Sequence, residues 1–556
     1  MKNLILKSLA ASVVALLAGH AMAATPVPLT GAGTPDIAAL GAENVGYATT
    51  YASGSSAATP FIINAMKTDC TGTIYQYVSS GSQAYLCSKA DTFLGVATPF
   101  LIMHKRDGGG SINGVKASQG TQQTFLDVPG LATATACAAP VNGVSNCTAP
   151  AAFATVLGAR SELNLADVDP TQFNFALNGG PLTGVLPTYD AFATQIFGVA
   201  VNTRLRDALQ TAQSTDPDGV GPLNAPLAAG CVGVDSEACM PNLTTEHIST
   251  IFAGPAATAV VGGLNSIQSG HFTDWAKLRT GTTTSLQNLF SANVLANQPG
   301  NRDIHICTRT AGSGTLATFH IKYHNAPCNG GIDESIVTPT GQTISQESGA
   351  NGGVKIVHAM SGSADTENCL VGLNNGAAQG TFSPYPITVP AVDAKPFRWA
   401  IGIMGVERNA SGTLPYRFIK IDGFAPTARN VVEGKYKFWA EAGVMPPAGQ
   451  TATTDPLALE ILKNMTDPSL IANLNVLHLW STNGEKTGFL GIAGSPTSNP
   501  AFAPTFNTLT NGLMGAAFDN ARPVNPYSHT TATKGNLNHC RVPTAPSGAP
   551  IVLPMY

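Results

Sequence analysis

The stretch CTRTAGSGTLATFHIKYH, from Cys307 to His324, predicts both a fold unit and a ligand site. Arg309 precedes a Gly-Ser-Gly-Thr turn at Gly312–Thr315, and the residues that follow are typical of a helix. The first N–H groups of a helix have no partner within it, and the helix dipole favours negative charge there. The guanidinium of Arg309 would add a planar pair of donors suited to an oxyanion. We therefore expect an anion site, the alternative being a capped helix with a structural arginine. It is not a P-loop, because no Gly-Lys-Ser/Thr follows.

Two more turns of small residues come after predicted strands. One is ASGSSAAT at Ala52–Thr59, and the other is GGGS at Gly108–Ser111. An open α/β sheet gathers such turns at the carboxyl ends of its strands, where ligands bind. We expect the turns to meet around one ligand.

Two carboxylates follow the apolar start of the segment LNLADVDPTQF at Leu163–Phe173. Asp167 or Asp169 could simply cap a turn. Alternatively, a buried carboxylate could accept a hydrogen bond from a protonated oxyanion. Such a group would discriminate against sulfate, which has no proton to donate and would leave the acceptor unmatched.

Strand-like and helix-like segments alternate along the chain, which indicates an α/β fold. Apolar strands are expected at Asn44–Gly54, Phe93–His104, Ile196–Thr203 and Phe397–Glu407, and Thr244–Gly254 is expected to be a helix. Loop-rich insertions are expected at about 119–154 and 211–241, with a Gly-, Pro- and Asn-rich tail after Met445. The length suggests two or more lobes, each with its own core.

The amino-terminal residues predict export. Lys2 and Lys7 precede an apolar run at Leu9–Leu17, and Ala21-Met22-Ala23 follows it, so residues 1–23 are typical of a cleavable signal peptide. No cysteine stands at the cleavage point, so we expect a periplasmic or secreted protein without a lipid anchor or membrane insertion. A net charge of −4 argues against nucleic acid as a partner. A monomer is expected.

Ten cysteines in an exported chain predict disulfide bonds. Pairing neighbours in order gives Cys70–Cys87, Cys137–Cys147, Cys231–Cys239, Cys307–Cys328 and Cys369–Cys540. Sequence alone does not fix this connectivity. There is no Cys-x-x-Cys motif, so zinc ribbons and c-type haem are unsupported and no cofactor is expected.

Taken together, these pieces resemble the periplasmic phosphate-binding proteins of ABC importers, the PstS-like group of the type 2 periplasmic binding proteins. The matching pieces stand in the family's order: YASGSSAATPF at 51–61, HKRDGGGSINGVKA at 104–117, ADVD at 166–169, LTTEHISTIFAG at 243–254 with HFTDWAKL at 271–278, RTAGSGTLATF at 309–319, WAIGIMGVE at 399–407, and GFAPTARNVVEGKYKFWAE at 423–441.

The resemblance implies two Rossmann-like lobes with mixed sheets, joined by a double-crossover hinge. We expect lobe 1 at 24–197 plus 400–450, lobe 2 at 198–399, and a C-terminal extension at 451–556 packed on the lobes. The function implied by the resemblance is the capture of phosphate or a similar oxyanion in the cleft between the lobes. The partner it implies is an ABC permease, which would take up the bound ligand.

The resemblance also implies the ligand-binding residues. They belong to the three turns and the acidic segment: Ser56, Ala57, Ala58, Thr59, Gly110, Ser111, Asp167, Asp169, Arg309, Gly312, Ser313, Gly314 and Thr315. The sequence departs from the family's pattern at Ala58, where a threonine is usual, with Thr59 one residue later.

Two other classes of function stay open. One is a secreted or surface-associated binding protein with a non-transport role, because the insertions and tail add mass to the chain. The other is a phosphatase. The argument against it is that a closed cleft the size of phosphate would leave no room for a leaving group. His320 and His324 lie four residues apart on the predicted helix, but no His-Glu-x-x-His motif supports a metal site there. We expect packing or solvent-facing histidines.

Overall fold

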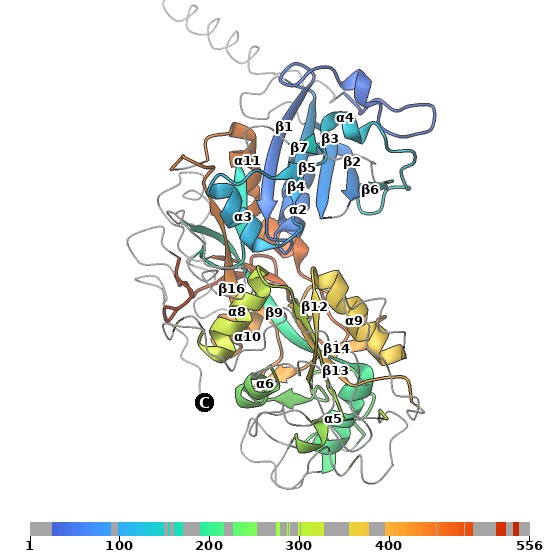
Figure 1. The fold of residues 1–556 in the computed structure, drawn as a ribbon, viewed down its shortest axis with the longest axis vertical. Helices are drawn as coiled ribbons and strands as arrows, with labels where there is room; N and C mark the ends of the chain where they lie inside the picture. The colour runs from blue at the N-terminus through green and yellow to red at the C-terminus, as the bar shows by residue number, and fades with distance from the viewer. Residues whose placement is uncertain are drawn as a thin grey trace, which may run out of the picture.

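The computed structural model describes residues 25–79, 81–89, 98–148, 154–155, 161–170, 189–215, 226–228, 230–252, 274–278, 286, 289, 299–300, 302–326, 328, 355–376, 395–451, 453–482, 484–492, 519–529 and 537–543. The expected signal peptide at 1–23 lies outside them. Two lobes follow one another along the long axis of the molecule (Figure 1). No helix among the described residues is long and apolar enough to cross a membrane.

Lobe 1 is a mixed sheet with helices on it. Its strands are β1 (Tyr47–Gly54), β2 (Cys70–Ser79), β3 (Ser82–Lys89), β4 (Phe100–Arg106), β6 (Val144–Cys147) and β8 (Leu163–Ala166), and its main helices are α2 (Thr59–Asp69) and α3 (Ser111–Ser118). The sheet order is β8-β1-β4-β3-β2-β6, with β1 parallel to both β8 and β4. Consequently β1, β4 and β8 end at the same edge, as the glycine-turn argument requires.

Smaller elements complete lobe 1. They are η1 (Ile37–Leu40), β5 (Thr124–Phe125), α4 (Val128–Leu131) and β7 (Ala154–Thr155).

Lobe 2 has β11 (Ile304–Arg309) between β12 (Lys355–Met360) and β13 (Ala400–Gly405), all parallel. Its helices are α5 (Thr203–Thr215), α6 (Thr245–Phe252), α8 (Gly314–His324), α9 (Ser363–Asn375) and α10 (Ala428–Val432). The short pieces β10 (Asn242–Leu243), η5 (Trp275–Lys277), β14 (Tyr416–Phe418) and β15 (Lys420–Ile421) complete it. The apolar run of β13 is buried at every position, as expected for a central strand.

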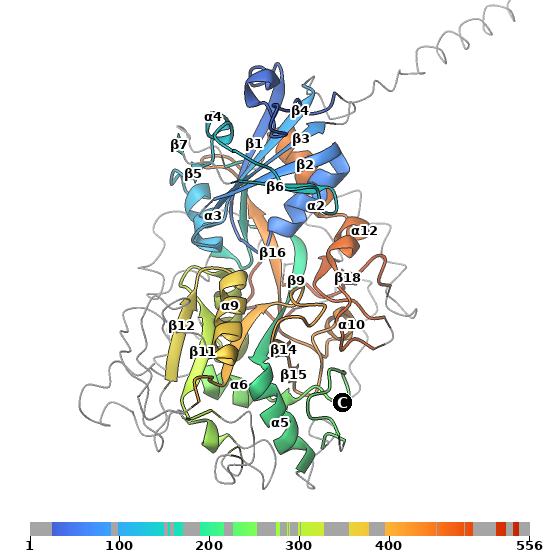
Figure 2. The same cartoon turned by 90° about the vertical axis from the view of Figure 1, so that its right-hand side faces the viewer.

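Two long strands connect the lobes (Figure 2). The strand β9 (Asp190–Asn202) pairs with β16 (Trp439–Met445) through its first half and with β13 through its second half. The sheet therefore runs without a break from β12 to β6. This two-lobed, mixed α/β architecture with two crossing strands confirms the predicted fold class.

The expected lobe boundary at residue 400 requires correction. Because β13 pairs with β11 and with the distal half of β9, residues 400–405 belong with the strands of lobe 2. The side chains of α10 are buried in the same apolar core as those of β13. The return to lobe 1 occurs within β16, whose distal half pairs with β8.

The C-terminal extension contributes to both the core and the sheet. Its elements are α11 (Pro456–Met465), α12 (Pro468–Ile471), η7 (Ala472–Leu474), β17 (Phe489–Ile492) and β18 (Val524–Asn525). Leu457, Ile461 and Leu462 of α11 share an apolar core with Phe61 of α2. The strand β17 pairs antiparallel with β9.

Five disulfides join all ten cysteines, and two of them differ from the expected pairing. Cys70–Cys87, Cys137–Cys147 and Cys231–Cys239 are as predicted. The expected Cys307–Cys328 and Cys369–Cys540 bonds are wrong: the bonds are Cys307–Cys369 and Cys328–Cys540. The reason is that α9 packs against β11 and β13, which brings Cys369 to Cys307.

Candidate functional site

The two glycine turns predicted to bind an anion contact each other across the cleft. The turn before α3 comes from lobe 1, and the turn before α8 comes from lobe 2. The N–H of Ile112 donates to the carbonyl oxygen of Gly312 at 3.0 Å. Gly110 and Gly312 both have positive φ, at 75° and 86°, which a side chain would strain. Glycine is therefore needed both for the turns and for this close approach.

Asp167 lies at this contact, and its side chain is buried. The hydroxyl of Ser55 donates to Oδ1, and the hydroxyl of Ser111 donates to Oδ2 at 3.1 Å. The N–H of Asp167 donates to the Ser111 hydroxyl, also at 3.1 Å. A Cβ atom on Gly314 would lie 2.7 Å from Oδ2 of Asp167. The carboxylate of lobe 1 is thus placed against the start of α8 in lobe 2.

Arg309 ends β11, and only 2% of its surface is exposed. Its Nη2 donates to the Ser361 carbonyl oxygen at 2.9 Å, and its Nη1 lies 3.3 Å from the hydroxyl of Ser363 and 3.4 Å from that of Thr315. The Nε atom has no hydrogen-bond partner among the described residues. A buried donor without a partner costs about 1–3 kcal/mol, so this atom is suited to a ligand.

Three more of the predicted residues, Ser313, Ala58 and Thr59, lie at the starts of α8 and α2. Ser313 is the N-cap of α8 and accepts from the N–H of Leu316 at 3.5 Å. The N–H of Ala58 donates to the Ser55 hydroxyl at 3.2 Å. Thr59 begins α2, and its buried Oγ1 has no hydrogen-bond partner among the described residues.

Burial governs the charges in this cluster. It raises the pKa of Asp167, while the hydrogen bonds from Ser55 and Ser111 and the positive charge of Arg309 oppose the rise. Burial also lowers the pKa of Arg309 to about 10, against the stabilising charge of Asp167. Lys105 lies near the end of β4, shortly before the turn at Gly108–Ser111, and it is fully buried. Its Nζ donates to the Gly54 carbonyl oxygen at 2.7 Å. The cluster therefore holds opposite charges from both lobes out of water.

Asp169 lies away from this cluster. Its Oδ2 accepts from the N–H of His539 at 3.0 Å, so it contacts the C-terminal extension. Of the two carboxylates that the sequence left open, the structure places Asp167 with the turns.

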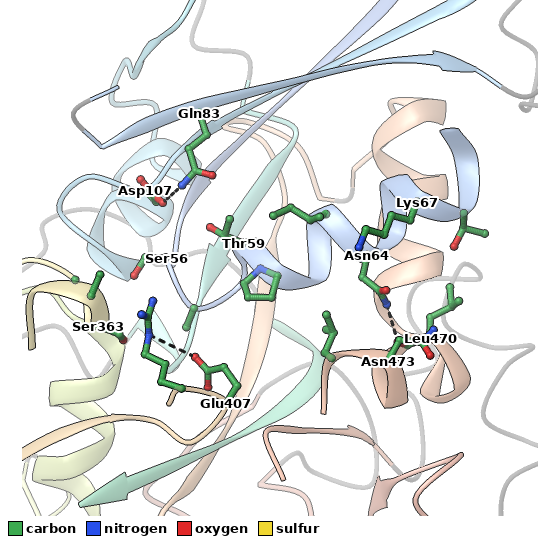
Figure 3. Close-up of a pocket in the computed structure, with 18 residues that line it drawn as sticks. Ser56, Thr59, Asn64, Lys67, Gln83, Asp107, Ser363, Glu407, Leu470 and Asn473 are labelled. Carbon is green, nitrogen blue, oxygen red and sulfur yellow. Dashed lines mark hydrogen bonds and ion pairs between the residues drawn. The ribbon is translucent and has the colours of Figure 1, made fainter. Parts of the chain in front are cut away.

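A pocket of about 820 Å³ opens beside the cluster, between the lobes. Figure 3 shows Ser56 and Thr59 of lobe 1 facing Ser363 and Glu407 of lobe 2. Its walls combine polar and apolar side chains: Ser56, Ala57, Thr59, Pro60, Ile63, Asn64, Lys67, Thr68, Gln83, Asp107, Gly362, Ser363, Ala364, Glu407, Arg408, Leu470, Asn473 and Leu474. The sequence argument that a hydrolase would lack room for a leaving group therefore does not hold.

Sequence reasoning missed several of these residues. Ser55 stands next to the predicted turn residues, so only its orientation was unknown. Ser363 begins α9, and Glu407 and Arg408 come two and three residues after the end of β13 at Gly405. Their positions at the carboxyl ends of parallel strands were the signal that could have identified them.

One group of described residues is compact enough to hold a metal ion: Glu441, His529 and His539, all buried. The side chains of this group already have hydrogen-bond partners within the protein. His529 Nδ1 lies 2.6 Å from Glu441 Oε2, and Lys322 Nζ lies 3.3 Å from His529 Nε2. The N–H of Glu441 donates to His539 Nε2 at 3.2 Å. We interpret the group as a hydrogen-bonded network that fixes the extension to β16. His320 and His324 form a pair with Nδ1 atoms 3.1 Å apart.

Searches against protein-family models and curated proteins give no match. Among solved structures, the chain is similar to several proteins, including these three. A protein from Clostridium perfringens, assigned as a phosphate ABC transporter substrate-binding protein and solved with bound phosphate, is 12% identical over 78% of this chain and 100% of its own, with a TM-score of 0.32. An ABC-type phosphate transport receptor from Vibrio cholerae is 13% identical over 77% and 99%, with a TM-score of 0.29. PstS from Borrelia burgdorferi is 8% identical over 77% and 98%, with a TM-score of 0.30.

Proposed function

We propose that this chain is a solute-binding protein that captures a tetrahedral oxyanion, phosphate in the first instance, between its two lobes. One observation carries the proposal: Arg309 and the start of α8 from lobe 2 face Ser55, Ser111 and Asp167 from lobe 1 in a buried cluster. Closure brings donors from both lobes to one point, so an anion there would favour the closed state.

The carboxylate of Asp167 supports phosphate over sulfate. Hydrogen phosphate can donate its proton to a carboxylate, whereas sulfate has no proton and would face an unmatched acceptor. We further propose that the protein acts outside the cytoplasm as the receptor of an ABC permease. The expected signal peptide supports export.

The test is titration calorimetry on protein freed of ligand by unfolding and refolding. We expect heat with phosphate and none with sulfate. Absence of heat with both ligands, from a folded protein, would contradict the proposal and favour a non-transport role.

Arg309→Lys keeps the charge but removes the planar fork. Hydrogen bonds to a charged group contribute about 1.5–3 kcal/mol each, so we expect phosphate affinity to fall by about tenfold or more. The control is Arg398→Lys, because Arg398 is equally buried in lobe 2 and donates to the Lys395 carbonyl oxygen at 2.7 Å. Equal affinities for phosphate in both variants would contradict a role for Arg309.

A further inference from the structure

The pocket between the lobes is larger than an inorganic anion requires. A water molecule takes up about 30 Å³ in the liquid, so an anion of five heavy atoms needs on the order of 150 Å³. The pocket measures about 820 Å³, which lies in the range of sites for small organic ligands, about 300–1,000 Å³. The pocket can therefore hold an organic group in addition to an anion.

The pocket and the anion cluster adjoin each other. Ser56 and Thr59, which line the pocket, follow Ser55, whose hydroxyl donates to Asp167. On the opposite wall, Ser363 lines the pocket and its hydroxyl lies 3.3 Å from Nη1 of Arg309. An anion held by Arg309 could therefore carry a substituent that extends into the pocket.

The walls indicate what kind of substituent would fit. The ionisable side chains that line the pocket are Lys67, Arg408, Asp107 and Glu407, two of each sign, so a second charged group gains little there. Among them, Glu407 Oε2 is buried and has no hydrogen-bond partner among the described residues. Arg408 Nε likewise has no hydrogen-bond partner there, but it lies 4.0 Å from Glu407 Oε1 in an ion pair (Figure 3). Thr59 Oγ1, on the facing wall, is also buried and has no hydrogen-bond partner among the described residues. Buried polar atoms without partners match a neutral group that carries hydroxyls.

Apolar side chains complete the pocket. Ile63 of α2 and Leu470 and Leu474 of the extension are among them. The extension therefore shapes the pocket, as well as packing on the lobes. A polyol or sugar has carbon faces that suit such walls and hydroxyls that suit the orphan polar atoms.

We propose that the ligand is a phosphate monoester of a polyol or sugar, with its phosphate in the Arg309 cluster and its hydroxylated group in this pocket. The inference rests on the proposed oxyanion function and deepens it. Glu407 Oε2 accepts a hydrogen bond from a ligand hydroxyl, and Thr59 and Arg408 provide further polar contacts. The proposal concerns binding alone, and no covalent bond is made or broken.

Calorimetric titrations of the mature wild-type protein with inorganic phosphate, glycerol 3-phosphate and glucose 6-phosphate test this. Glycerol and glucose serve as unphosphorylated controls. We expect at least one ester to bind tenfold or more tightly than inorganic phosphate, and no binding of the free polyols. If inorganic phosphate binds and neither ester binds more tightly, the ester proposal is wrong and the proposed function stands. If neither phosphate nor ester binds, both are wrong.

A variant separates the pocket from the anion cluster. Glu407→Gln should reduce the affinity for the preferred ester by about tenfold and leave the affinity for inorganic phosphate unchanged, because a site built for a hydroxyl discriminates through its polar partner. Glu433→Gln is the matched control, since Glu433 pairs with Lys435 at 2.7 Å and does not line the pocket. An equal loss for ester and phosphate in Glu407→Gln would overturn the assignment of Glu407. If that variant is unfolded, the wild-type comparison of ligands still decides the proposal.

Discussion

Gly314 begins α8 and faces lobe 1. A Cβ atom at this position would lie 2.6 Å from both Cβ of Asp167 and Oγ of Ser111, closer than real Cβ contacts allow. Its helical position would otherwise accept alanine well, because alanine has the best helix propensity. The glycine is therefore required by the closed arrangement of the lobes and not by the helix.

Gly314→Ala should consequently disfavour closure while the lobes stay folded. Overpacking of this kind costs about 1–3 kcal/mol, so phosphate affinity should fall by about tenfold. Small-angle X-ray scattering with phosphate present should show a larger radius of gyration than the wild type gives. Gly31→Ala is the control, since a Cβ atom added to Gly31 would have no atom within 4 Å and this residue does not line the pocket. A variant that closes and binds like the wild type would show that the contact yields at little cost.

At the scale of elements, the segment at 537–543 connects parts of the chain that are far apart. Cys540 bonds to Cys328, which follows α8 in lobe 2. His539 contacts Asp169, which follows β8 in lobe 1. The extension is thus fixed covalently to one lobe and by hydrogen bonds to the other.

Removing this disulfide should destabilise the protein more than removing a local one. Cys328–Cys540 spans 212 residues and Cys231–Cys239 spans 8. The chain-entropy model then predicts that Cys328→Ser with Cys540→Ser lowers the free energy of unfolding by about 3 kcal/mol more than Cys231→Ser with Cys239→Ser. Urea unfolding of both double variants measures the difference. Equal losses would mean that the unfolded chain does not gain the freedom that the model assumes.

Among the elements, the features that depend on neighbouring residues could be predicted from the sequence, and those that depend on remote packing could not. The turn at Gly312–Thr315 and the three local disulfides depend on neighbouring residues, and they were predicted correctly. The bond Cys307–Cys369 depends on α9 packing against β11, which no local pattern reveals. The choice between Asp167 and Asp169 depends likewise on where the remote His539 is placed.

For the molecule as a whole, the lobe boundary was misplaced for a related reason. An apolar strand such as β13 carries no sign of which sheet it will join. Its placement follows from pairing with β11, about a hundred residues earlier in the chain. The fold class was predictable because strand and helix alternation is a property of the entire sequence.

Buried titratable groups should make the stability of the whole molecule depend on pH, in two opposite senses. Burial lowers the pKa of His104 to about 4, so between about pH 6.5 and 4 the unfolded state binds the proton and stability falls as the pH falls. Burial raises the pKa of Asp69 to about 7, so between about pH 4 and 7 the folded state binds the proton and stability falls as the pH rises.

Single substitutions should separate these contributions. His104→Phe keeps the stacking on Tyr51, whose ring centroid lies 4.7 Å from that of His104, but removes the proton site. The slope of unfolding free energy against pH between pH 5 and 6 should then decrease by about 1.4 kcal/mol per pH unit. Asp69→Asn should increase the same slope by about the same amount, because the lost group acted in the opposite sense. Urea unfolding at several pH values measures both slopes. If both variants change the slope in the same direction, the pKa of at least one of the two groups is not shifted in the direction that its burial predicts. The variant whose slope changes with the unexpected sign identifies that group.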